Sequence, residues 1–459
     1  MKYAKNLLEL LVFSFAIAIA NLAHAEKNDT LSFLTFSDIH LNVNQTLPME
    51  INPRGPVIDP LKMNLDPTTF VSMLDNIKKT FPHPQFLLIT GDMAGYDPAY
   101  VYQDEEYVLQ HIDSIYRETP KILVFGNEDS LAKPYGPFFY STGINDRHST
   151  YELAMKMKNG WKNGFLSTGI YCKTNPGTYP CIIDEDPING NFSLYLADNL
   201  RLIAFNSIVF SSYPSNKATQ AVTNAELTWI ADELQNAAWH NNNILIATHI
   251  PCGSDTSNLD SGSAFWRNNN QVTFYNLLAR YQKNIIGILA GHTHYDELKV
   301  LQNTAKRNVG AILITPGFVT LHGNAPGLRN YYLNRNYFNW AISDYATYNF
   351  DATLALNRLY DFHNYYCTAT ADKNQSILDC LHNVTADKMS TYFTVGNPNY
   401  PGFGKIAYPN NIFITLPGAN PSPSVTSNGG GSSNVVYYVA GSAAAAGLGA
   451  ILFESINSN

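Results

Sequence analysis

Seven side chains that could bind metal ions lie between residues 38 and 294, each directly after a short apolar run. They are two aspartates, one asparagine and four histidines: Asp38, His40, Asp92, Asn127, His249, His292 and His294. Carboxylate and amide oxygens together with imidazole nitrogens suit a pair of divalent metal ions. The residue types therefore predict a dinuclear metal site.

Five apolar runs precede these side chains, and each run is typical of a buried strand. The runs cover residues 31–36, 86–89, 122–125, 244–247 and 285–290. Open α/β sheets gather their chemistry at the carboxyl ends of strands, so five such ends can converge in one crevice. The order along the chain is D-x-H, G-D, G-N, H and G-H-x-H.

The intervening segments predict an α/β protein, because apolar runs alternate with amphipathic stretches over residues 31–316. Asp66 and Pro67 are an N-cap and a first helical residue, and they predict a helix that runs to about Thr80. A capping box from Thr223 to Glu226 predicts the start of another helix. The remaining expectations are helices over 104–118, 223–241, 271–281 and 375–383, a rim of the site over 136–190, and strands over 331–366 that complete the second sheet.

The composition excludes one broad class of function. The 459 residues carry a net charge of −8, and only 14% of them are charged. A scaffold for nucleic acids needs a basic face, which this balance disfavours. An anionic substrate remains compatible with it, because bound metals supply positive charge of their own.

The N-terminus has the pattern of a secretory signal peptide over residues 1–25. Lys2 and Lys5 precede the apolar residues 10–20, and Ala23 and Ala25 form an A-x-A cleavage site. An uncleaved membrane anchor is the alternative, but the apolar core is short for one.

The C-terminus is expected to be separate from the catalytic domain, which we predict over residues 26–420 with an aromatic-rich extension. Residues 421–434 are a Pro/Ser/Gly linker. Residues 435–453 carry no charge and are long enough to span a bilayer as a candidate transmembrane anchor. The alternative is a helix or strand docked on the domain.

Five cysteines follow the predicted cleavage site, in a compartment where disulfides can form. Cys172 with Cys181 and Cys367 with Cys380 each flank a short loop and are plausible pairs. Cys252 is left over, three residues after His249. It could be a reactive thiol beside the metals, but a free, buried cysteine is the favoured interpretation.

The order of motifs resembles that of the calcineurin-like metallophosphoesterase superfamily over roughly residues 31–330. The resemblance implies an α/β fold of two mixed β-sheets packed as a sandwich flanked by helices. It also implies that Asp92 bridges two metals, which would share a hydroxide that attacks phosphorus in line. The implied ligands are Asp38, His40 and His294 for the first metal, and Asn127, His249 and His292 for the second.

Within that superfamily the chain looks similar to the acid-sphingomyelinase-like phosphodiesterases. The likeness rests on the strings T-G-D at 90–92, T-H-I-P at 248–251 and N-x-P-G-x-R at 324–329. Members of this family are exported and use zinc, so the resemblance implies two zinc ions and a secreted, periplasmic or extracellular location.

Two departures from the family pattern affect catalysis. The family reads G-N-H-[DE] where this chain has Glu128 after Asn127, and it has an A-H-D string where this chain has Tyr96. Both catalytic histidines of the family are thus missing at their aligned positions. Glu128 could donate a proton if desolvation raised its pKa, and Tyr96 could donate a hydrogen bond to a phosphate oxygen.

These observations predict a secreted or surface phosphodiesterase. Residues 26–30 leave no room for the lipid-presenting domain of true sphingomyelinases, which favours a small soluble phosphodiester or a nucleotide as substrate. One alternative is a nucleotidase or phosphomonoesterase on the same metals. Another is a metal-binding surface protein with little turnover, which the missing histidines motivate.

Overall fold

The computed structural model describes residues 30–59, 62–143, 146–150, 152–153, 169–257, 261–337, 339–367, 375–399 and 406–418. The expected signal peptide, the linker and the candidate membrane segment at 435–453 lie outside these residues. In the part of the chain that is described, no helix is long and apolar enough to cross a bilayer.

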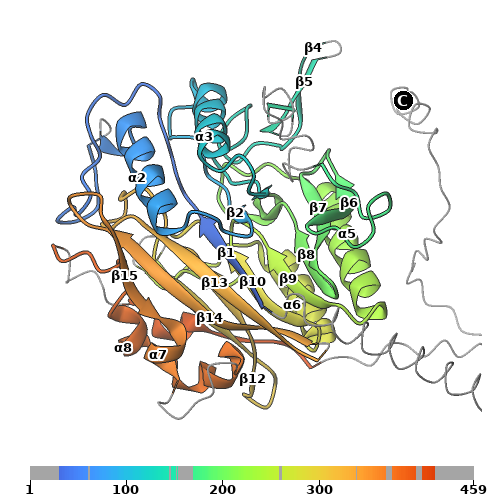
Figure 1. Cartoon of the computed structure of the whole chain (residues 1–459). Helices are drawn as coiled ribbons and strands as arrows, with labels where there is room; N and C mark the ends of the chain where they lie inside the picture. Colours follow the sequence, from blue (N-terminus) through green and yellow to red (C-terminus); the bar gives the residue numbers. More distant parts are fainter. Residues whose placement is uncertain are drawn as a thin grey trace, which may run out of the picture. The chain divides into compact units, whose positions relative to one another are not determined.

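Two mixed β-sheets carry the fold, as predicted (Figure 1). The first sheet has the order β15-β14-β13-β1-β2-β3. Strands β1, β2 and β3 are parallel, and β13, β14 and β15 extend the sheet in antiparallel fashion. Its strands are β1 (Thr30–Phe36), β2 (Leu87–Ile89), β3 (Lys121–Leu123), β13 (Gly327–Asn336), β14 (Asn339–Phe350) and β15 (Leu356–Asp361).

The second sheet has the order β16-β11-β12-β10-β9-β8-β7-β6, and its centre, β12-β10-β9-β8, is parallel. Its strands are β6 (Cys181–Asp186), β7 (Asn191–Ala197), β8 (Leu200–Ala204), β9 (Asn243–Ala247), β10 (Ile285–Ala290), β11 (Glu297–Gln302), β12 (Asn308–Ile314) and β16 (Phe413–Thr415). A separate pair consists of β4 (Tyr140–Gly143) and β5 (Asp146–His148).

The first sheet is buried on both faces, and successive side chains of β1 alternate between the two cores. Phe33 packs into the core shared with the second sheet, whereas Leu34 and Phe36 pack into a core with α2 and α3. Successive side chains of a strand point to opposite faces, so one apolar run serves both cores. The near-continuous apolar character of the run follows from this double burial.

Helices cover the outer faces of both sheets (Figure 1). The helices α2 and α3 lie on the first sheet, and α5 packs on β8 and β9 of the second. The helical elements are α2 (Pro67–Thr80), α3 (Val101–Ile115), η2 (Ser207–Phe210), α5 (Gln220–Trp239), α6 (Asn268–Tyr281), α7 (Phe362–Tyr366), η3 (Ile377–Asn383), α8 (Ala386–Ser390) and η4 (Pro409–Ile412).

The predicted start of α2 is confirmed, because Asp66 accepts a hydrogen bond from the Thr69 amide at 2.9 Å. The predicted capping box of α5 is wrong. The helix begins one turn earlier, with Thr219 as its N-cap, and Thr223 lies inside it. The carboxylate that the box assigned to capping, Glu226, is buried against the second sheet instead.

The structure differs from two further predictions. The helix predicted over 104–118 begins at Val101 and ends at Ile115. The strands predicted over 331–366 form, but they pair with β1 in the first sheet rather than completing the sheet that holds β9 and β10. The last five residues of that segment are helix α7.

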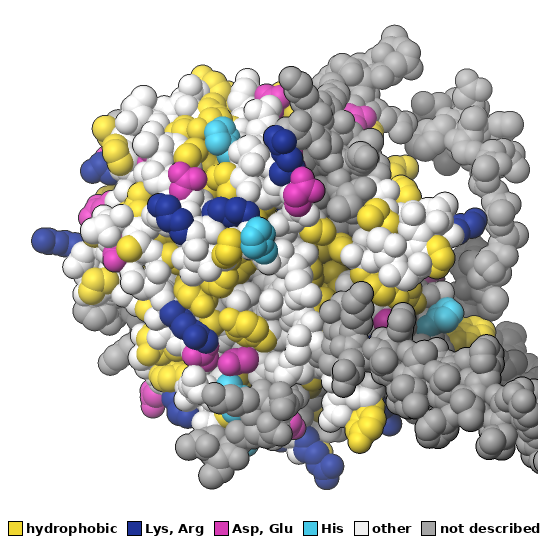
Figure 2. Space-filling view, viewed as in Figure 1, with side chains coloured by type: hydrophobic (Ala, Val, Ile, Leu, Met, Phe, Trp, Pro, Cys, Tyr) yellow, Lys and Arg dark blue, Asp and Glu magenta, His cyan; other side chains and the backbone are white. Residues whose placement is uncertain are grey.

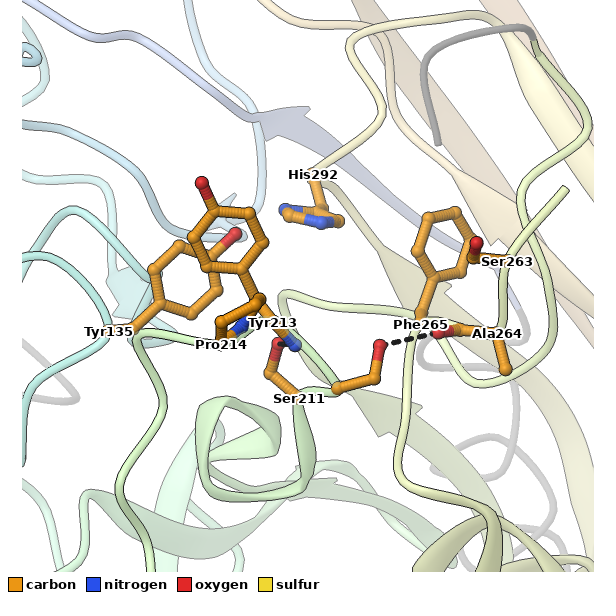
Figure 3. A pocket seen from close by; sticks show the side chains of 9 residues that line it. Tyr135, Ser211, Tyr213, Pro214, Ser263, Ala264, Phe265 and His292 are labelled. Carbon is orange, nitrogen blue, oxygen red and sulfur yellow. Dashed lines mark hydrogen bonds between the residues drawn. The ribbon is translucent and has the colours of Figure 1, made fainter. Parts of the chain in front are cut away.

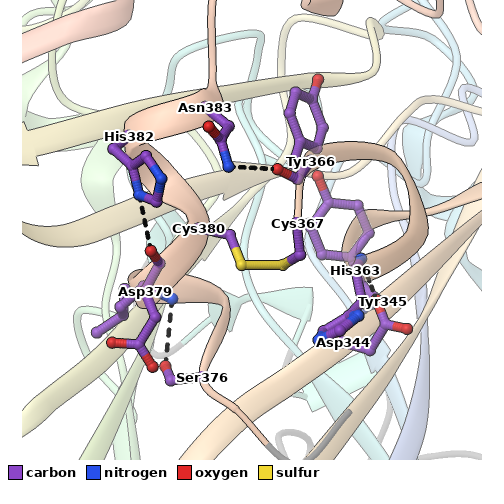
Figure 4. Close-up of a disulfide and its surroundings, with 11 residues drawn as sticks. Asp344, Tyr345, His363, Tyr366, Cys367, Ser376, Asp379, Cys380, His382 and Asn383 are labelled. Atoms are coloured by element: carbon purple, nitrogen blue, oxygen red, sulfur yellow. Dashed lines mark hydrogen bonds between the residues drawn. A yellow bond between two sulfur atoms is a disulfide. The ribbon is translucent and has the colours of Figure 1, made fainter. Parts of the chain in front are cut away.

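Both predicted disulfides are present, Cys172–Cys181 and Cys367–Cys380. The second joins the end of α7 to η3 (Figure 4). The Asn383 side-chain amide donates to the Tyr366 carbonyl at 2.8 Å beside it, so the two short helices are tied twice. On the face shown in Figure 2, basic and acidic side chains are interspersed.

Glu226 makes the stability of this fold depend on pH. It accepts hydrogen bonds from the Asn191 side chain at 2.7 Å and from the Asn206 amide at 3.1 Å. Burial raises the pKa of Glu226 from 4.5 to about 8. Between these values the unfolded chain releases the proton while the folded chain keeps it, so the free energy of unfolding falls as pH rises.

We therefore expect Glu226→Gln to shift the difference between the Tm at pH 8 and the Tm at pH 5 in favour of pH 8, relative to wild-type protein, because the amide carries no proton to lose. Thermal unfolding of the metal-loaded protein at both pH values measures it. The matched control is Asp232→Asn, an exposed carboxylate on the same helix, which should keep the wild-type difference. An unchanged difference in Glu226→Gln would show that Glu226 is not the responsible group.

Candidate metal centre

Loops at the carboxyl ends of β1, β2, β3, β9 and β10 deliver the seven predicted ligands to one place. Five of these residues have left-handed backbone: φ is 48° at Asp38, 43° at His40, 55° at Asp92, 78° at His292 and 64° at His294. Non-glycine residues seldom adopt this conformation, and it clusters at functional sites where surrounding structure enforces it. These five residues lie in the loops after β1, β2 and β10.

The side chains form two groups of potential ligands. Within each group the ligand atoms lie within 4.8 Å of one another. The first group is Asp38, His40 and His294, and the second is Asp92, His249 and His292. The first coincides with the ligands that the resemblance implied for one metal.

Asp92 connects the two groups. Its Oδ2 lies 3.5 Å from Nε2 of His40 and 3.2 Å from Nε2 of His249, so one oxygen faces an imidazole from each group. The Asn127 Oδ1 lies 3.1 Å from the same His249 nitrogen, which adds a neutral oxygen to the second group. The structure thus brings all seven predicted ligands together.

Neighbouring groups fix the orientation of these side chains. The Nδ1 of His249 is 2.7 Å from the Thr90 carbonyl, an arrangement that leaves Nε2 to face the site. The Oδ2 of Asp38 accepts hydrogen bonds from the Ser37 hydroxyl at 2.5 Å and from the His292 amide at 3.0 Å. Such outer contacts commonly set the tautomer and direction of metal ligands.

The electrostatics of the site fit divalent cations. Burial raises the pKa of Asp38 to about 7 and lowers that of His40 to about 4 and that of His292 to about 3. Buried carboxylates and imidazoles are costly to charge in isolation. A cation stabilises the carboxylates in their charged form and takes the imidazoles in their neutral form, so this donor set fits a dinuclear metal centre.

A cavity of about 390 Å³ opens over the two groups. His40, Asp92, Asn127, His292 and His294 reach its wall. The other residues that line it are Tyr96, Glu128, Tyr135, Tyr213, Asp255, Phe265, Thr293, Leu321 and His322. A substrate in this cavity would therefore contact most of the ligand set.

Tyr96 contacts His40 of the first group of potential ligands. Its ring stacks on His40 with centroids 4.3 Å apart, and its hydroxyl lies 3.2 Å from the His40 Nε2. The Tyr96 amide donates to the Asn64 side chain at 2.9 Å, which anchors the backbone. Burial and then the Asp92 carboxylate hold the pKa of Tyr96 well above its usual value, so the phenol keeps its proton.

Glu128 stands beside the second group. Its Oε1 accepts a hydrogen bond from the Asn127 side-chain amide at 2.9 Å, and its backbone amide donates to Asp92 Oδ1 at 2.7 Å. Burial, followed by the Asp92 carboxylate, raises the pKa of Glu128 to about 8. The desolvation that the sequence analysis required for a proton donor at this position is thus found.

Sequence reasoning missed Asp129, which organises the loops that follow β2 and β3 and carry two of the predicted ligands. Its carboxylate accepts hydrogen bonds from the amides of Asp92 at 2.8 Å, Met93 at 2.7 Å and Gly126 at 2.8 Å. A side chain at Gly126 would collide with Asp92, since a Cβ there would lie 2.1 Å from the Asp92 nitrogen. The available signal was an acidic residue three positions after a glycine that follows a strand.

Sequence reasoning also missed His322, which is half-buried in the cavity wall. Its ring contacts that of His294 with centroids 4.4 Å apart. No local motif marks it, because it comes from the loop after β12 and reaches the site only through the packing of the sheets.

The N-x-P-G-x-R string at residues 324–329 contacts the loop that carries His294, through its arginine. Arg329 forms a buried ion pair with Asp296, two residues after the predicted ligand His294. The guanidinium also lies over the Tyr345 ring at 4.4 Å from its centroid. This ion pair therefore holds the loop of His292 and His294 against the first sheet.

Cys252 is buried and has no disulfide partner among the described residues. Burial raises the pKa of its thiol to about 12, which disfavours the reactive thiolate. The interpretation as a buried, unreactive cysteine is the one that the structure supports.

Comparison with known proteins agrees with this geometry. The family model described as calcineurin-like phosphoesterase matches residues 31–296, so the chain belongs to that family, as predicted. It is 25% identical over 314 residues to sphingomyelin phosphodiesterase 2 of Caenorhabditis elegans, covering 64% of this chain and 46% of that protein. It is 23% identical over 344 residues to acid sphingomyelinase-like phosphodiesterase 3b of Mus musculus, covering 69% and 70%.

The chain spans about half the length of several curated relatives it matches, with 46%, 44% and 52% of three of them covered. Among solved structures, a dimetal phosphatase from Danio rerio is similar with a TM-score of 0.42 and 11% identity, covering 72% of this chain and 97% of that one. A purple acid phosphatase from yellow lupin is similar with a TM-score of 0.42 and 12% identity, covering 72% and 53%.

Proposed function

We propose that this protein is a metal-dependent phosphodiesterase that hydrolyses small phosphodiesters on two divalent ions. The observation that carries the proposal is the position of Asp92. One of its carboxylate oxygens, Oδ2, faces both His40 and His249. A carboxylate in that position can bind two ions at once, and a two-metal site is a recurrent device for attack at phosphorus.

In this proposal Asp38, His40 and His294 hold one ion. The other is held by Asn127, His249 and His292, and Asp92 binds both. We propose zinc for both ions, because four imidazoles in the donor set favour it over magnesium or calcium. Two such ions supply Lewis-acid activation of water and neutralise charge on the phosphate oxygens.

Two side chains of the cavity act on the substrate in this proposal, and a third positions one of them. The protonated Tyr96 hydroxyl donates a hydrogen bond to a phosphate oxygen near the first ion. Asn127 positions Glu128 through its 2.9 Å hydrogen bond. Glu128 then holds a proton beside the second ion and donates it to the departing oxygen, in place of the histidine that the family carries there.

A comparison of two chromogenic substrates tests the proposal. Zinc-loaded protein should hydrolyse bis(p-nitrophenyl) phosphate with a higher kcat/KM than p-nitrophenyl phosphate. A preference for the monoester would instead favour a nucleotidase or phosphomonoesterase on the same site. No turnover of either substrate by protein that carries two metals per chain would favour a metal-binding surface protein.

We also propose that the protein is exported and held at a membrane by residues 435–453. The two disulfides support an oxidising compartment. Full-length protein should then sediment with membranes, whereas a chain ending at Asn420 should be soluble and equally active. Aggregation or metal loss in the shortened chain would mean that this segment is part of the fold and not an anchor.

A further inference from the structure

His322 ends a row of four aromatic rings along the first group of potential ligands. Tyr96 stacks on His40 with ring centroids 4.3 Å apart, and His40 stacks on His294 at 5.0 Å. His322 continues the row, with its centroid 4.4 Å from that of His294. The two inner rings are proposed ligands of the first ion, so Tyr96 and His322 lie on either side of them.

The ring nitrogens of His322 have no hydrogen-bond partner among the described residues, whereas buried polar side chains usually have one. His322 also belongs to neither group of potential ligands. Its side chain is half-buried and lines the cavity over the ligands. The nitrogens are therefore available to a molecule bound in that cavity.

The backbone around His322 is fixed by contacts with other segments. The His322 carbonyl accepts a hydrogen bond from the Tyr295 hydroxyl at 3.2 Å. The next carbonyl, that of Gly323, accepts one from the Asn397 side-chain amide at 2.8 Å. A ring on a fixed loop needs little reorganisation when a substrate arrives, and such preorganisation is what makes a hydrogen-bond donor effective in catalysis.

The ring beside the second group of ligands offers no such donor. Phe265 meets His292 edge to face with centroids 5.7 Å apart, much as His322 meets His294. Figure 3 shows the rings of Phe265 and His292 at a pocket that adjoins the cavity. Among the residues that line the cavity, His322 is thus the imidazole that is not a proposed ligand.

An imidazole in this position suits a phosphate. The ring carries at least one N–H donor whether or not it is protonated. The Tyr96 hydroxyl donates from the opposite end of the row, so the two donors would flank the same phosphate. An N–H group directed at a phosphoryl oxygen stabilises the charge that this oxygen bears during in-line displacement.

We propose that His322 is a catalytic residue, which donates a hydrogen bond from a ring nitrogen to a phosphoryl oxygen of the substrate at the first ion. The inference rests on the proposed function, because it concerns the same site. It gives this chain a histidine that acts on the phosphate, although both family motifs lack theirs. Because the ring acts by donating a hydrogen bond and not by releasing its proton, a neutral donor of similar reach should replace it.

Two substitutions distinguish a hydrogen-bond donor from a ring that only packs. His322→Leu removes the donor and should lower kcat/KM for bis(p-nitrophenyl) phosphate about tenfold or more. His322→Gln carries a side-chain N–H and should restore kcat/KM to within about threefold of wild type. His111→Leu, on α3 and outside the cavity lining, is the matched control and should behave as wild type.

Binding of inorganic phosphate to zinc-loaded protein tests the same hydrogen bond without turnover. Isothermal titration should give a Kd for phosphate that is about fivefold or more higher in His322→Leu than in wild type. His322→Gln and His111→Leu should bind phosphate nearly as tightly as wild type. Elemental analysis of each sample should find two zinc ions per chain, because His322 holds no metal in this proposal.

Unchanged kinetics and phosphate affinity in His322→Leu would overturn the inference. Equal losses in His322→Leu and His322→Gln would also overturn it, since the ring would then be needed for packing. Loss of zinc from His322→Leu would make His322 a metal ligand and have the same consequence. Absence of turnover by wild-type protein that carries two zinc ions would contradict the proposed function, while the phosphate titrations would still test His322.

Discussion

Asp92→Asn is expected to lower kcat/KM for bis(p-nitrophenyl) phosphate more than any other single substitution at the site. The amide keeps the shape of the carboxylate but removes the charge that faces both His40 and His249. Loss of an outer-shell partner typically costs about 10- to 100-fold in metal affinity or activity. Loss of a carboxylate shared by both ions should cost more than that.

Steady-state kinetics at saturating zinc measure this effect, and elemental analysis of the same sample reports whether an ion has been lost. Asp232→Asn makes the same chemical change on the exposed face of α5 and should retain wild-type activity. If Asp92→Asn retained more than a tenth of wild-type activity, Asp92 could not be the bridging ligand.

Glu128→Gln is expected to separate substrates by their leaving group. The amide cannot supply the proton, although it keeps the size of the side chain. For a phosphodiester with an alkoxide leaving group we expect a loss of about a hundredfold or more in kcat, which is typical for removal of a general acid. Nitrophenolate leaves without such help, so bis(p-nitrophenyl) phosphate should be affected far less.

The ratio of the two rates within each protein is the measured quantity, so a partial loss of folded enzyme cancels. Glu118→Gln, an exposed position after α3, serves as the matched control and should leave the ratio unchanged. Equal losses on both leaving groups would mean that Glu128 positions Asn127 and donates no proton.

The features that sequence alone predicted well are those encoded locally. Asp66 caps α2 through a contact three residues away, and the apolar run 285–290 is strand β10 with the predicted bounds. The seven predicted metal ligands also lie together in the structure, because each comes from a loop that follows a strand. Parallel strands bring their carboxyl ends to one edge, so a local pattern repeated five times specifies a site.

The features that escaped prediction depend on contacts between distant segments. Thr219 caps α5 instead of Thr223, and Glu226 hydrogen-bonds to Asn191 of β7 and to Asn206 in the loop after β8. No rule of helix ends contains that information. Tyr135 and Tyr213 are far apart in the chain, and they meet only when the loops beyond β3 and β8 fold over the same cavity. Tertiary packing decided each of these positions.

Metal content tests the central claim most directly. Wild-type protein, reconstituted with zinc and freed of excess metal, should contain close to two zinc ions per chain by elemental analysis, and chelation should remove both the metal and the phosphodiesterase activity. Less than one ion per chain in the reconstituted, folded protein, or full activity after the metal has been removed, would contradict the two-metal account.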